Sequence, residues 1–525
     1  MKDRNRRIRT DGRKSNMGVK DMRKKKRFER YVVIIMTALF VLTGAAKAET
    51  VQIHRYEQSR PFEGWGTSLC WWANRIGYSD ELAEMAATAF FDAKEGLGLN
   101  IVRYNIGGGD DESHHHITRT DSAMEGFAVH PSYDAASGEY QWDWDWEKDA
   151  GQRNVLDKAL KKTGEELIVE LFSNSPPYFL TVSGCSSGHT NPNMDNLRED
   201  AYDAFARYLV GVAEHFEKVW KIRVQSLEPM NEPYTNYWKA YSPKQEGCRF
   251  SPGASQSRIL LAVRQELDHA GMEHVLLPAS DETSLDTQLN SWYALSEETK
   301  EAVDRIDVHT YQGAGRVPLS KLAFKQGKGL WMSEVDGGDM LGNGGEMGAA
   351  LWLAQRIVDD MNGLQPSAWI LWQVIDNHIS AEGYKGNRDS GMVNVNGGYW
   401  GLSVADHDRV SLIHTMKYYA FGQFSRFIRP GDELLSSSSH SLAAINPVNG
   451  KITLVYVNAS PETAEVELDL TSMGNHWSME AYRTSGGMAE GEKWALCEQA
   501  GHLSHTFRMN MLANAVTTVV LTPEK

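Results

Sequence analysis

Cysteine is scarce in this chain, with four among 525 residues. Cys70, Cys185, Cys248 and Cys497 do not form the closely spaced pairs that bind zinc, which excludes a cysteine zinc site of the familiar spacings. Cys185 and Cys248 both fall in segments that should follow strands carrying site residues. A disulfide between these two and free buried thiols both fit the sequence, because an exported chain permits oxidation.

A long apolar run is also missing. The apolar stretch at residues 32–46 is shorter than the about 20 residues that a membrane-spanning helix needs. It follows 30 residues that hold 14 Lys/Arg against 4 Asp/Glu, and it ends in Ala-Lys-Ala at residues 46–48. This arrangement is typical of a secretory signal peptide, so we predict cleavage after Ala48 and a secreted mature chain. Translation from Met17 or Met22, or an uncleaved anchor, stays open because the basic region is long.

Positive charge is scarce beyond this segment. Removing residues 1–48 takes away 15 Lys/Arg and 4 Asp/Glu, which changes the formal net charge from −15 to −26. A surface this acidic argues against nucleic acid as a partner, and against a membrane unless the N-terminal segment stays as an anchor. It suits a soluble exported enzyme that acts on a neutral polymer.

Tryptophan, in contrast, is abundant, with 16 residues. The composition is otherwise that of an ordinary globular protein, with 41% hydrophobic and 23% charged residues. Most of the tryptophans should lie in the core, and the others leave aromatic surface that can stack against sugar rings. The length allows two to three domains, and the sequence has no internal repeat.

Eight short apolar or β-rich segments follow the N-terminal region, and most are followed by Gly, Pro, Asn or Asp and then by a helical pattern. They are residues 64–71, 100–106, 167–173, 224–230, 274–279, 306–311, 329–333 and 368–375. Several are apolar at nearly every position, as strands buried on both faces are, and residues 201–210 read as an amphipathic helix. Eight such units predict an α/β fold, a (β/α)8 TIM barrel.

The pattern changes near residue 427. Alternating segments at residues 451–457, 464–470 and 517–521, with turn residues between them, predict an all-β sandwich attached to the side of the barrel. The strand-like residues 51–55 should join that sandwich. The predicted domains are the basic segment and signal peptide at residues 1–48, an N-terminal strand at 49–61, the catalytic barrel at 62–426 and the sandwich at 427–525.

Two glutamates stand where apolar segments end. Glu232 closes the fourth barrel segment and Glu334 closes the seventh, and the carboxyl ends of barrel strands meet at one face. A single glutamate at a strand end is usually a solvated loop charge, but a pair is what double-displacement glycoside hydrolysis needs. One carboxyl group protonates the leaving oxygen and the other attacks the sugar, and we expect them about 5 to 5.5 Å apart.

The neighbours of the pair suggest separate roles. Glu232 should act as acid and then base, which needs a raised pKa, whereas Glu334 should be ionised to attack. Asn231 could hydrogen-bond a substrate hydroxyl.

Hydrogen-bond donors for an ionised Glu334 stand near the ends of two other predicted strands. Arg103, His309 and Tyr311 are the candidates, although a structural ion pair and satisfied core rings would explain them too. Trp372 is a candidate floor for the reacting sugar or a residue of the barrel core.

Four motifs together resemble glycoside hydrolase family 30. They are Asn-Glu-Pro at residues 231–233, Trp-Met-Ser-Glu at 331–334, Gly-Trp-Gly-Thr-Ser-Leu at 64–69 and Lys-Tyr-Tyr-Ala-Phe-Gly-Gln-Phe-Ser-Arg-Phe-Ile at 417–428. The resemblance covers nearly all of the mature chain. It implies a retaining enzyme with a (β/α)8 barrel and a side-attached sandwich, with Glu232 as acid/base and Glu334 as nucleophile.

The loops resemble the endo-β-1,6-galactanase branch of that family more than its glucosylceramidase or xylanase branches. The similar segments are residues 105–111, 118–122, 174–178 and 232–238, which add Asp111 and Asn174 as candidate substrate-binding residues. The resemblance implies action on β-1,6-galactan side chains of arabinogalactan, without metal or cofactor. Because loops set specificity, a β-1,6-glucanase or β-glucosidase of the same family is the alternative, followed by a non-catalytic carbohydrate-binding barrel.

Three further motifs have structural explanations. Gly-Gly-Gly at residues 107–109 lacks the spacing of a dinucleotide loop, and we predict a tight turn that lets substrate approach the backbone. The three histidines at 114–116 could offer two metal ligands on one face, but no third ligand stands at a useful spacing, so we expect no metal. The Trp-Asp alternation at 142–146 should pack on the barrel rather than form a sugar-stacking strip.

Overall fold

The computed structural model describes a defined part of the chain. The described residues run from 48 to 524, except 111–112, 120–121, 130–131, 138, 164–166, 384–397 and 475. The predicted signal segment before Ala48 and the candidate residue Asp111 therefore lie outside the described residues.

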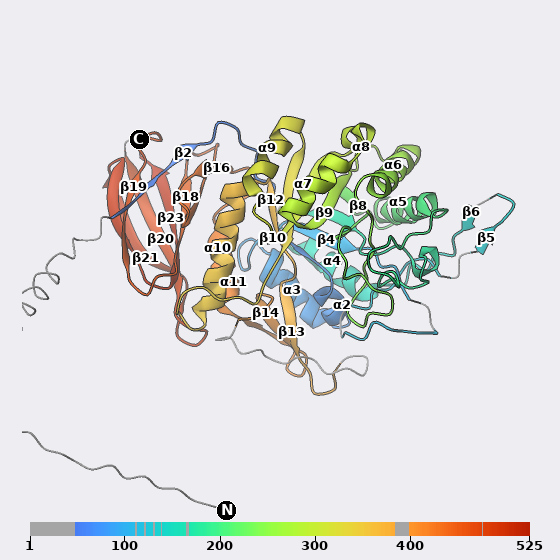
Figure 1. Cartoon of the computed structure of the whole chain (residues 1–525). Helices are drawn as coiled ribbons and strands as arrows, with labels where there is room; N and C mark the ends of the chain where they lie inside the picture. Colours follow the sequence, from blue (N-terminus) through green and yellow to red (C-terminus); the bar gives the residue numbers. More distant parts are fainter. Residues whose placement is uncertain are drawn as a thin grey trace, which may run out of the picture. The chain divides into compact units, whose positions relative to one another are not determined.

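Eight parallel strands form the predicted (β/α)8 barrel (Figure 1). In order around the barrel they are β3 (Gly64–Ser68), β4 (Ile101–Asn105), β7 (Ile168–Phe172), β8 (Ser226–Glu228), β9 (Pro278–Ser284), β10 (Arg305–Gln312), β11 (Gly329–Val335) and β12 (Ala368–Leu371). β12 pairs in parallel with β3, and a parallel bridge between Ser226 and Leu276 joins the fourth and fifth strand regions. The barrel is thus closed. Glu232 follows its fourth strand and Glu334 lies at the end of its seventh strand, as the sequence predicts.

Helices follow the strands along the chain. They are α2 (Trp72–Ile76), α3 (Asp80–Phe91), α4 (Ala150–Lys162), α5 (Tyr202–Lys218), α6 (Ala254–His269), α7 (Leu285–Ala294), α8 (Glu297–Ala302), α9 (Arg316–Gln326), α10 (Met347–Leu364) and α11 (Met416–Ser425). The predicted amphipathic stretch forms the first half of α5, whose buried face includes Phe205, Leu209 and Phe216. Burying such an apolar stripe against the sheet stabilises a helix more than its intrinsic propensity does.

The fifth barrel strand differs from its prediction. It begins at Pro278 rather than at residue 274, and it extends to Ser284 through the polar run Ser-Asp-Glu-Thr. The apolar pattern ends early because Asp281 and Glu282 are buried and paired with polar side chains, including Arg103 and Gln256. Buried polar groups are tolerated in a strand when they have such partners, so hydrophobic periodicity misses this part of the barrel.

A β-sandwich follows the barrel. One sheet has the order β2-β16-β17-β18-β23-β20-β21 and the other β1-β19-β22. The strands are β1 (Glu49–Gln52), β2 (His54–Arg55), β16 (Glu433–Ser436), β17 (Ser441–Ile445), β18 (Ile452–Asn458), β19 (Ala464–Asp469), β20 (Trp477–Ser485), β21 (Glu492–Leu503), β22 (Thr506–Met511) and β23 (Ala515–Pro523). The N-terminal strands β1 and β2 each join one of these sheets.

The sandwich packs against the barrel helices α10 and α11, which lie between the two in Figure 1. One hydrophobic cluster runs from the barrel helices into the seven-stranded sheet and includes Phe421, Val455 and Val516. Gln423 on α11 also donates to the Thr484 hydroxyl at 2.9 Å. Residues 50–525 form one compact unit, so the domain boundaries at residues 61 and 426 stay predictions.

Two smaller sheets decorate the barrel. They are a hairpin of β5 (Ser132–Asp134) and β6 (Glu139–Gln141), and a sheet of β13 (Ile375–Ile379), β14 (Ser403–Asp406) and β15 (Ser411–His414). The tryptophan strip follows the hairpin. Trp144 stacks on Tyr208 of α5 with ring centroids 5.7 Å apart, and Trp146 stacks on His215 at 3.6 Å. These rings pack on the barrel, and the segment that carries them leads into α4.

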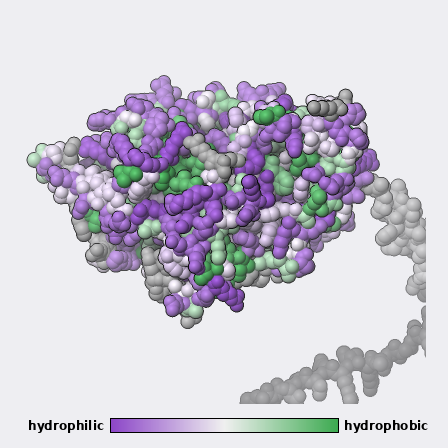
Figure 2. Space-filling model, turned by 180° about the vertical axis from the view of Figure 1, so that it is seen from behind, coloured by the Kyte–Doolittle hydropathy of each residue, from purple (hydrophilic) through white to green (hydrophobic). Residues whose placement is uncertain are grey.

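The described surface is largely hydrophilic on the face in Figure 2, where hydrophobic residues form small separate groups. Within the described ranges, no helix combines the length and the apolar character that crossing a membrane requires. All four cysteines are free thiols, and Cys70, Cys185 and Cys248 are buried. Of the two alternatives for Cys185 and Cys248, the structure therefore has free buried thiols.

Candidate active site

A cavity of about 520 Å³ opens where the barrel strands end. Both glutamates line it, together with three tryptophans, Trp71, Trp372 and Trp400. The other lining side chains are polar: Arg119, Asn231, Gln245, Thr283, Tyr311, Gln312, Gln373 and Asp376. An aromatic wall with convergent polar groups is a common form of ligand site.

Glu334 is the next-to-last residue of β11, and its carboxyl group is almost fully buried. Its Oε2 accepts a hydrogen bond from the Arg103 guanidinium at 3.1 Å, and its Oε1 accepts one from the Tyr311 hydroxyl at 3.0 Å. The structure thus brings two of the predicted donors to this carboxyl group.

Glu232 lies four residues beyond the end of β8, with a left-handed backbone at φ 47°. This conformation is uncommon for a residue with a side chain and is a known form of local strain at functional sites. It is held by a hydrogen bond from the Glu232 amide to the Asp281 carbonyl at 2.9 Å. The carboxyl group accepts hydrogen bonds from the Tyr237 hydroxyl and from His309 Nδ1, the latter at 3.2 Å.

His309 joins the two carboxyl groups. Its Nδ1 lies 3.2 Å from Glu232 Oε1 and 3.5 Å from Glu334 Oε1, and its Nε2 lies 3.1 Å from Asp281 Oδ1. One carboxylate oxygen of each glutamate and a nitrogen of His309 all lie within 4.8 Å of one another. The glutamates are therefore as close as a retaining pair requires, and closer than the about 6.5–9.5 Å of inverting pairs.

The pKa values of the two glutamates are the reverse of the sequence expectation. Burial raises the pKa of Glu334 to about 7, against the opposing effects of His309 and Arg103. Burial also acts to raise the pKa of Glu232, but hydrogen bonds and charge from His309, with the Tyr237 hydroxyl, lower it overall. The expectation of a raised pKa at Glu232 is wrong for the free protein, because Glu232 lies against a cation rather than in an apolar environment.

His309 is that cation. Burial alone would lower the pKa of His309, but the carboxylates of Asp281 and Glu334 raise it well above its usual value. The imidazole is therefore protonated; it donates a hydrogen bond from Nδ1 to Glu232, and its Nε2 forms an ion pair with Asp281. A protonated imidazole favours the charged form of each carboxylate beside it, and it lies closer to Glu232 than to Glu334. Of the two glutamates, Glu334 therefore has the higher pKa.

Arg103 lies at the centre of a buried network of charges. Its guanidinium contacts Glu170 at 2.9 Å, Asp281 at 2.5 Å and Glu334 at 3.1 Å, and it lies over the Phe172 ring at 4.1 Å. Three carboxylates around one guanidinium hold that side chain in a single orientation. Both parts of the sequence interpretation of Arg103 apply, because it is a structural ion-pair residue that also contacts Glu334.

The other predicted site residues differ in position. Asn231 lines the cavity, and its Oδ1 is buried without a hydrogen-bond partner in the protein. Trp372 also lines the cavity and packs edge-on against Trp71 with ring centroids 5.0 Å apart, so it belongs to both the cavity wall and a small core cluster. Asn174 is buried and donates to Asn105 at 3.2 Å, and it is not among the residues that line the cavity.

Several site residues escaped the sequence interpretation. Asp281 lies beyond the apolar part of its strand, where hydrophobic periodicity gives no signal. Tyr237 and Arg119 lie in the loop segments 232–238 and 118–122, which have no residue pattern that indicates a chemical role for either side chain. Arg119 lies over the Trp71 ring at 4.6 Å and pairs with Asp376 at 3.1 Å. Trp400 stacks on Tyr311 with centroids 6.0 Å apart.

The glycine triplet at residues 107–109 packs its backbone against the backbone of a neighbouring loop. A Cβ atom on Gly108 would meet the Pro176 carbonyl oxygen at 2.6 Å, and Gly109 has a left-handed φ of 64°. The triplet forms irregular backbone rather than the predicted tight turn, and a neighbouring loop packs against its backbone. Glu246 holds this segment by accepting a hydrogen bond from the Gly108 amide at 2.8 Å.

The motif at residues 417–428 contributes a buried lysine that contacts segments lining the cavity. The buried Lys417 ammonium contacts Asp336 Oδ1 at 2.6 Å and donates to the Tyr399 carbonyl at 3.0 Å. The other oxygen of Asp336 accepts from the Gly401 amide at 2.6 Å. This buried pair therefore connects the end of β11 to the segment that carries Trp400.

The comparisons with known proteins agree with this architecture. The model of O-glycosyl hydrolase family 30 matches residues 48–286. An endo-β-1,6-galactanase of Hypocrea rufa is 33% identical over 460 residues, covering 84% of this chain and 88% of that protein. An exo-β-1,6-galactobiohydrolase of Bifidobacterium longum subsp. longum is 24% identical over 535 residues, covering 79% of this chain and 34% of that protein.

A solved structure extends the comparison to the fold. The catalytic domain of GH30 xylanase C from Talaromyces cellulolyticus superposes with a TM-score of 0.67 at 17% identity, covering 90% of this chain and 100% of that domain. At this identity the likeness concerns the fold alone. Together with the identity to the Hypocrea rufa enzyme along most of both chains, it leads to one assignment. The chain belongs to glycoside hydrolase family 30 and is a glycoside hydrolase.

Proposed function

We propose that this protein hydrolyses a β-glycosidic bond with retention of configuration, using Glu334 as nucleophile and Glu232 as acid/base. The observation that carries this proposal is the short distance between the two carboxyl groups, whose nearest ligand atoms lie within 4.8 Å. That spacing leaves no room for the water that an inverting enzyme places opposite the leaving group.

In the first step, Glu334 attacks the anomeric carbon while Glu232 gives its proton to the leaving oxygen. Arg103 and Tyr311 each donate to one oxygen of the attacking carboxylate, which fixes its orientation in the cavity wall. In the second step, Glu232 removes a proton from water, and that water releases the sugar from Glu334.

The reversed pKa values give His309 a part in this sequence. Because Glu334 has the higher pKa of the two, a single proton on the pair resides mainly on Glu334, whereas the first step needs that proton on Glu232. His309 Nδ1 is within 3.5 Å of both carboxylates, so it offers a path for the proton from one to the other. The reactive form is therefore a minor protonation state of the free enzyme, and groups that change the pKa of either glutamate change its population.

The proposed substrate is the β-1,6-linked galactan of arabinogalactan side chains, cleaved internally. The names of the two relatives support the linkage and the sugar, and the endo-acting relative is similar over 84% of this chain. Trp71, Trp372 and Trp400 supply aromatic faces for sugar rings, and Asn231 offers a free amide oxygen to a hydroxyl group.

Product analysis tests the substrate. The mature protein is incubated with debranched arabinogalactan, β-1,6-glucan and xylan, and the released sugars are identified. We expect a range of β-1,6-galacto-oligosaccharides from arabinogalactan and none from xylan. Release from glucan but not from galactan would contradict the substrate, and release of galactobiose alone from the start would contradict internal cleavage.

A chemical-rescue experiment tests the roles of the glutamates. We expect Glu334→Ala to abolish turnover and added azide to restore activity with an α-configured glycosyl azide, because the small anion occupies the space of the lost carboxylate. Glu232→Ala should instead give a β-configured azide with a substrate whose leaving group needs no protonation. Normal activity of Glu334→Ala would refute the assignment.

We also propose that the protein is exported and that its mature chain begins at Glu49. The basic and apolar segments that precede Ala48 support this. Mass spectrometry of the protein recovered from the culture medium of a producing host should find Glu49 as the first residue. Retention of residues 1–48 in a membrane fraction would favour the uncleaved anchor.

A further inference from the structure

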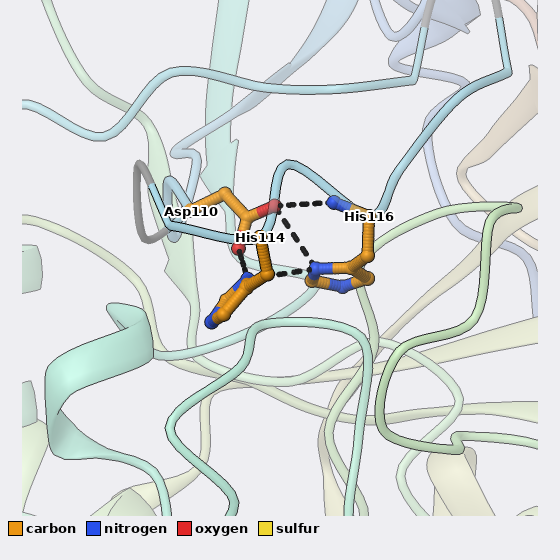
Figure 3. A group of neighbouring side chains, drawn as sticks. All are labelled: Asp110, His114 and His116. Atoms are coloured by element: carbon orange, nitrogen blue, oxygen red, sulfur yellow. Dashed lines mark hydrogen bonds and ion pairs between the residues drawn. The ribbon is translucent and has the colours of Figure 1, made fainter.

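Three polar side chains meet in the loop that follows β4. Asp110, His114 and His116 point toward one another in Figure 3. Asp110 Oδ1 lies 2.9 Å from His114 Nδ1, Asp110 Oδ2 lies 2.9 Å from His116 Nδ1, and the two Nδ1 atoms are 3.3 Å apart. In the sequence no third ligand stands at a useful spacing from these histidines, and the fold supplies one as the carboxylate of Asp110.

The spacing of these atoms fits a metal ion. Zinc binds histidine nitrogens at about 2.0–2.1 Å in tetrahedral sites, so two such nitrogens should be about 3.3 Å apart. The Nδ1 atoms of His114 and His116 have this separation. We propose that Asp110, His114 and His116 bind a divalent transition-metal ion, with zinc as the best fit.

The surroundings of His116 prepare its Nδ1 as a ligand. His116 Nε2 lies 2.9 Å from the Ser187 hydroxyl, which itself donates to the Lys239 carbonyl at 3.1 Å. With the Ser187 proton directed to Lys239, the Ser187 oxygen is an acceptor for His116 Nε2, and the Cys185 sulfur, 3.5 Å from Nε2 and 3.1 Å from the Ser187 oxygen, is a second one. A neutral His116 then carries its lone pair on Nδ1, toward the proposed ion. Histidines that bind metals almost always donate their other nitrogen to such an outer partner.

The donor set favours zinc and its neighbours over calcium or magnesium. Two imidazoles and one carboxylate suit zinc, nickel and copper, whereas calcium takes six to eight oxygen ligands and magnesium prefers oxygen and water. The side chains of Asp110 and His114 are 17% and 23% exposed. An ion can therefore enter from solvent and keep a water molecule as its fourth ligand.

The ion would stabilise the loops at the edge of the active site and would not take part in the chemistry of the two glutamates. Tyr241, in the loop that follows Glu232, packs edge-on against His114 and His116 with centroids 5.4 and 5.7 Å away. The Arg119 amide, three residues beyond His116, donates to the Pro243 carbonyl in the same loop at 3.1 Å. Fixing the histidines fixes the segment that extends Arg119 into the cavity, so zinc should stabilise the folded protein.

Calorimetry tests the site. The full chain without a purification tag is stripped with a chelator, dialysed and titrated with ZnCl2, and CaCl2 serves as the control ion. We expect one zinc ion per chain at this site, a higher Tm in zinc, and no response to calcium. His114→Asn and His116→Asn should each weaken binding more than about 100-fold, because loss of an outer partner alone costs about 10–100-fold.

Two further variants separate a metal site from a hydrogen-bonded cluster. His115→Asn is the matched control, since His115 is exposed, outside the cluster and at a φ of 34° that asparagine tolerates. It should bind zinc as the wild type does, while Ser187→Ala should bind about 10–100-fold more weakly.

Anomalous diffraction at the zinc edge from ZnCl2-soaked crystals locates the ion. We expect a peak between Asp110, His114 and His116. No zinc binding, binding that survives His116→Asn, or a peak confined to Glu232, His309 and Glu334 would each overturn the proposal.

Discussion

Tyr311→Phe tests how the protonation of the two glutamates limits the enzyme. The change removes one hydroxyl, which donates to Glu334 Oε1 at 3.0 Å, and leaves the ring that stacks on Trp400 and packs on His309. The fold should therefore be unaffected. A hydrogen bond to a charged group contributes about 1.5–3 kcal/mol, and its loss should raise the pKa of Glu334 by about one to two units.

The expected effect depends on pH in a specific way. The reactive form has Glu334 ionised and Glu232 protonated, and in the free enzyme Glu334 has the higher pKa, about 7. Raising that pKa further makes the reactive form rarer, so kcat/KM should fall about 10- to 100-fold at neutral and acidic pH. In alkali both glutamates are ionised in most molecules, so the population of the reactive form then depends on Glu232 alone. The variant and wild-type curves should converge there.

The assay is the pH profile of kcat/KM on one soluble β-1,6-galacto-oligosaccharide. The upper limb, near pH 7 in the wild type, should move up by about one to two units in Tyr311→Phe. Tyr237→Phe should move the lower limb instead, because Tyr237 donates to Glu232. Tyr234→Phe is the control, since that ring is 43% exposed and packs on Arg249. An equal loss at every pH, or an upper limb that does not move, would refute the reasoning.

Three further predictions concern residues around the site. Burial raises the pKa of Glu246 from 4.5 to about 8, so between these pH values the folded protein holds a proton that the unfolded chain has released. The resulting stabilisation, about 5 kcal/mol, is fully present below pH 4.5 and is lost progressively as the pH rises to about 8. In urea unfolding at pH 5.5 and 8, Glu246→Gln should lose less stability with rising pH than the wild type, and an unchanged slope would contradict this. Lys417→Met should lower the free energy of unfolding by about 3–5 kcal/mol, because it leaves the Asp336 carboxylate without its cation. Adding Asp336→Asn to the same chain should restore much of this free energy, and no recovery would argue against the pair. Trp400→Ala should raise KM about 3- to 10-fold with little change in kcat, and a loss confined to kcat would oppose a role in sugar stacking.

The barrel and the glutamate pair are predictable from sequence because both depend on local patterns. Near-continuous apolar segments identify strands buried on two faces, and their ends identify the face where side chains meet. The fifth strand escapes this reasoning at Asp281, where a polar residue is buried because Arg103 and Ser333 are its partners. Such partners lie far apart in the chain, so no local pattern predicts them.

The electrostatics of the site is less predictable for the same reason. The catalytic role expected of Glu232 predicts a raised pKa for its carboxyl group. In the folded protein, His309 lies slightly closer to Glu232 than to Glu334, and that arrangement lowers the pKa of Glu232. The cluster of Asp110 with His114 and His116 is a similar case, because a loop conformation rather than a regular spacing brings the carboxylate to the histidines.

The covalent intermediate on Glu334 is the most direct test of the proposed mechanism. A 2-deoxy-2-fluoro-β-galactosyl fluoride combines a good leaving group with a fluorine that slows both steps, because it disfavours the oxocarbenium-like transition state. Mass spectrometry of the treated protein should find one fluorogalactosyl group, and peptide sequencing should locate it on Glu334. A label on Glu232, or turnover of the reagent to an α-configured product without any label, would contradict double displacement by this pair.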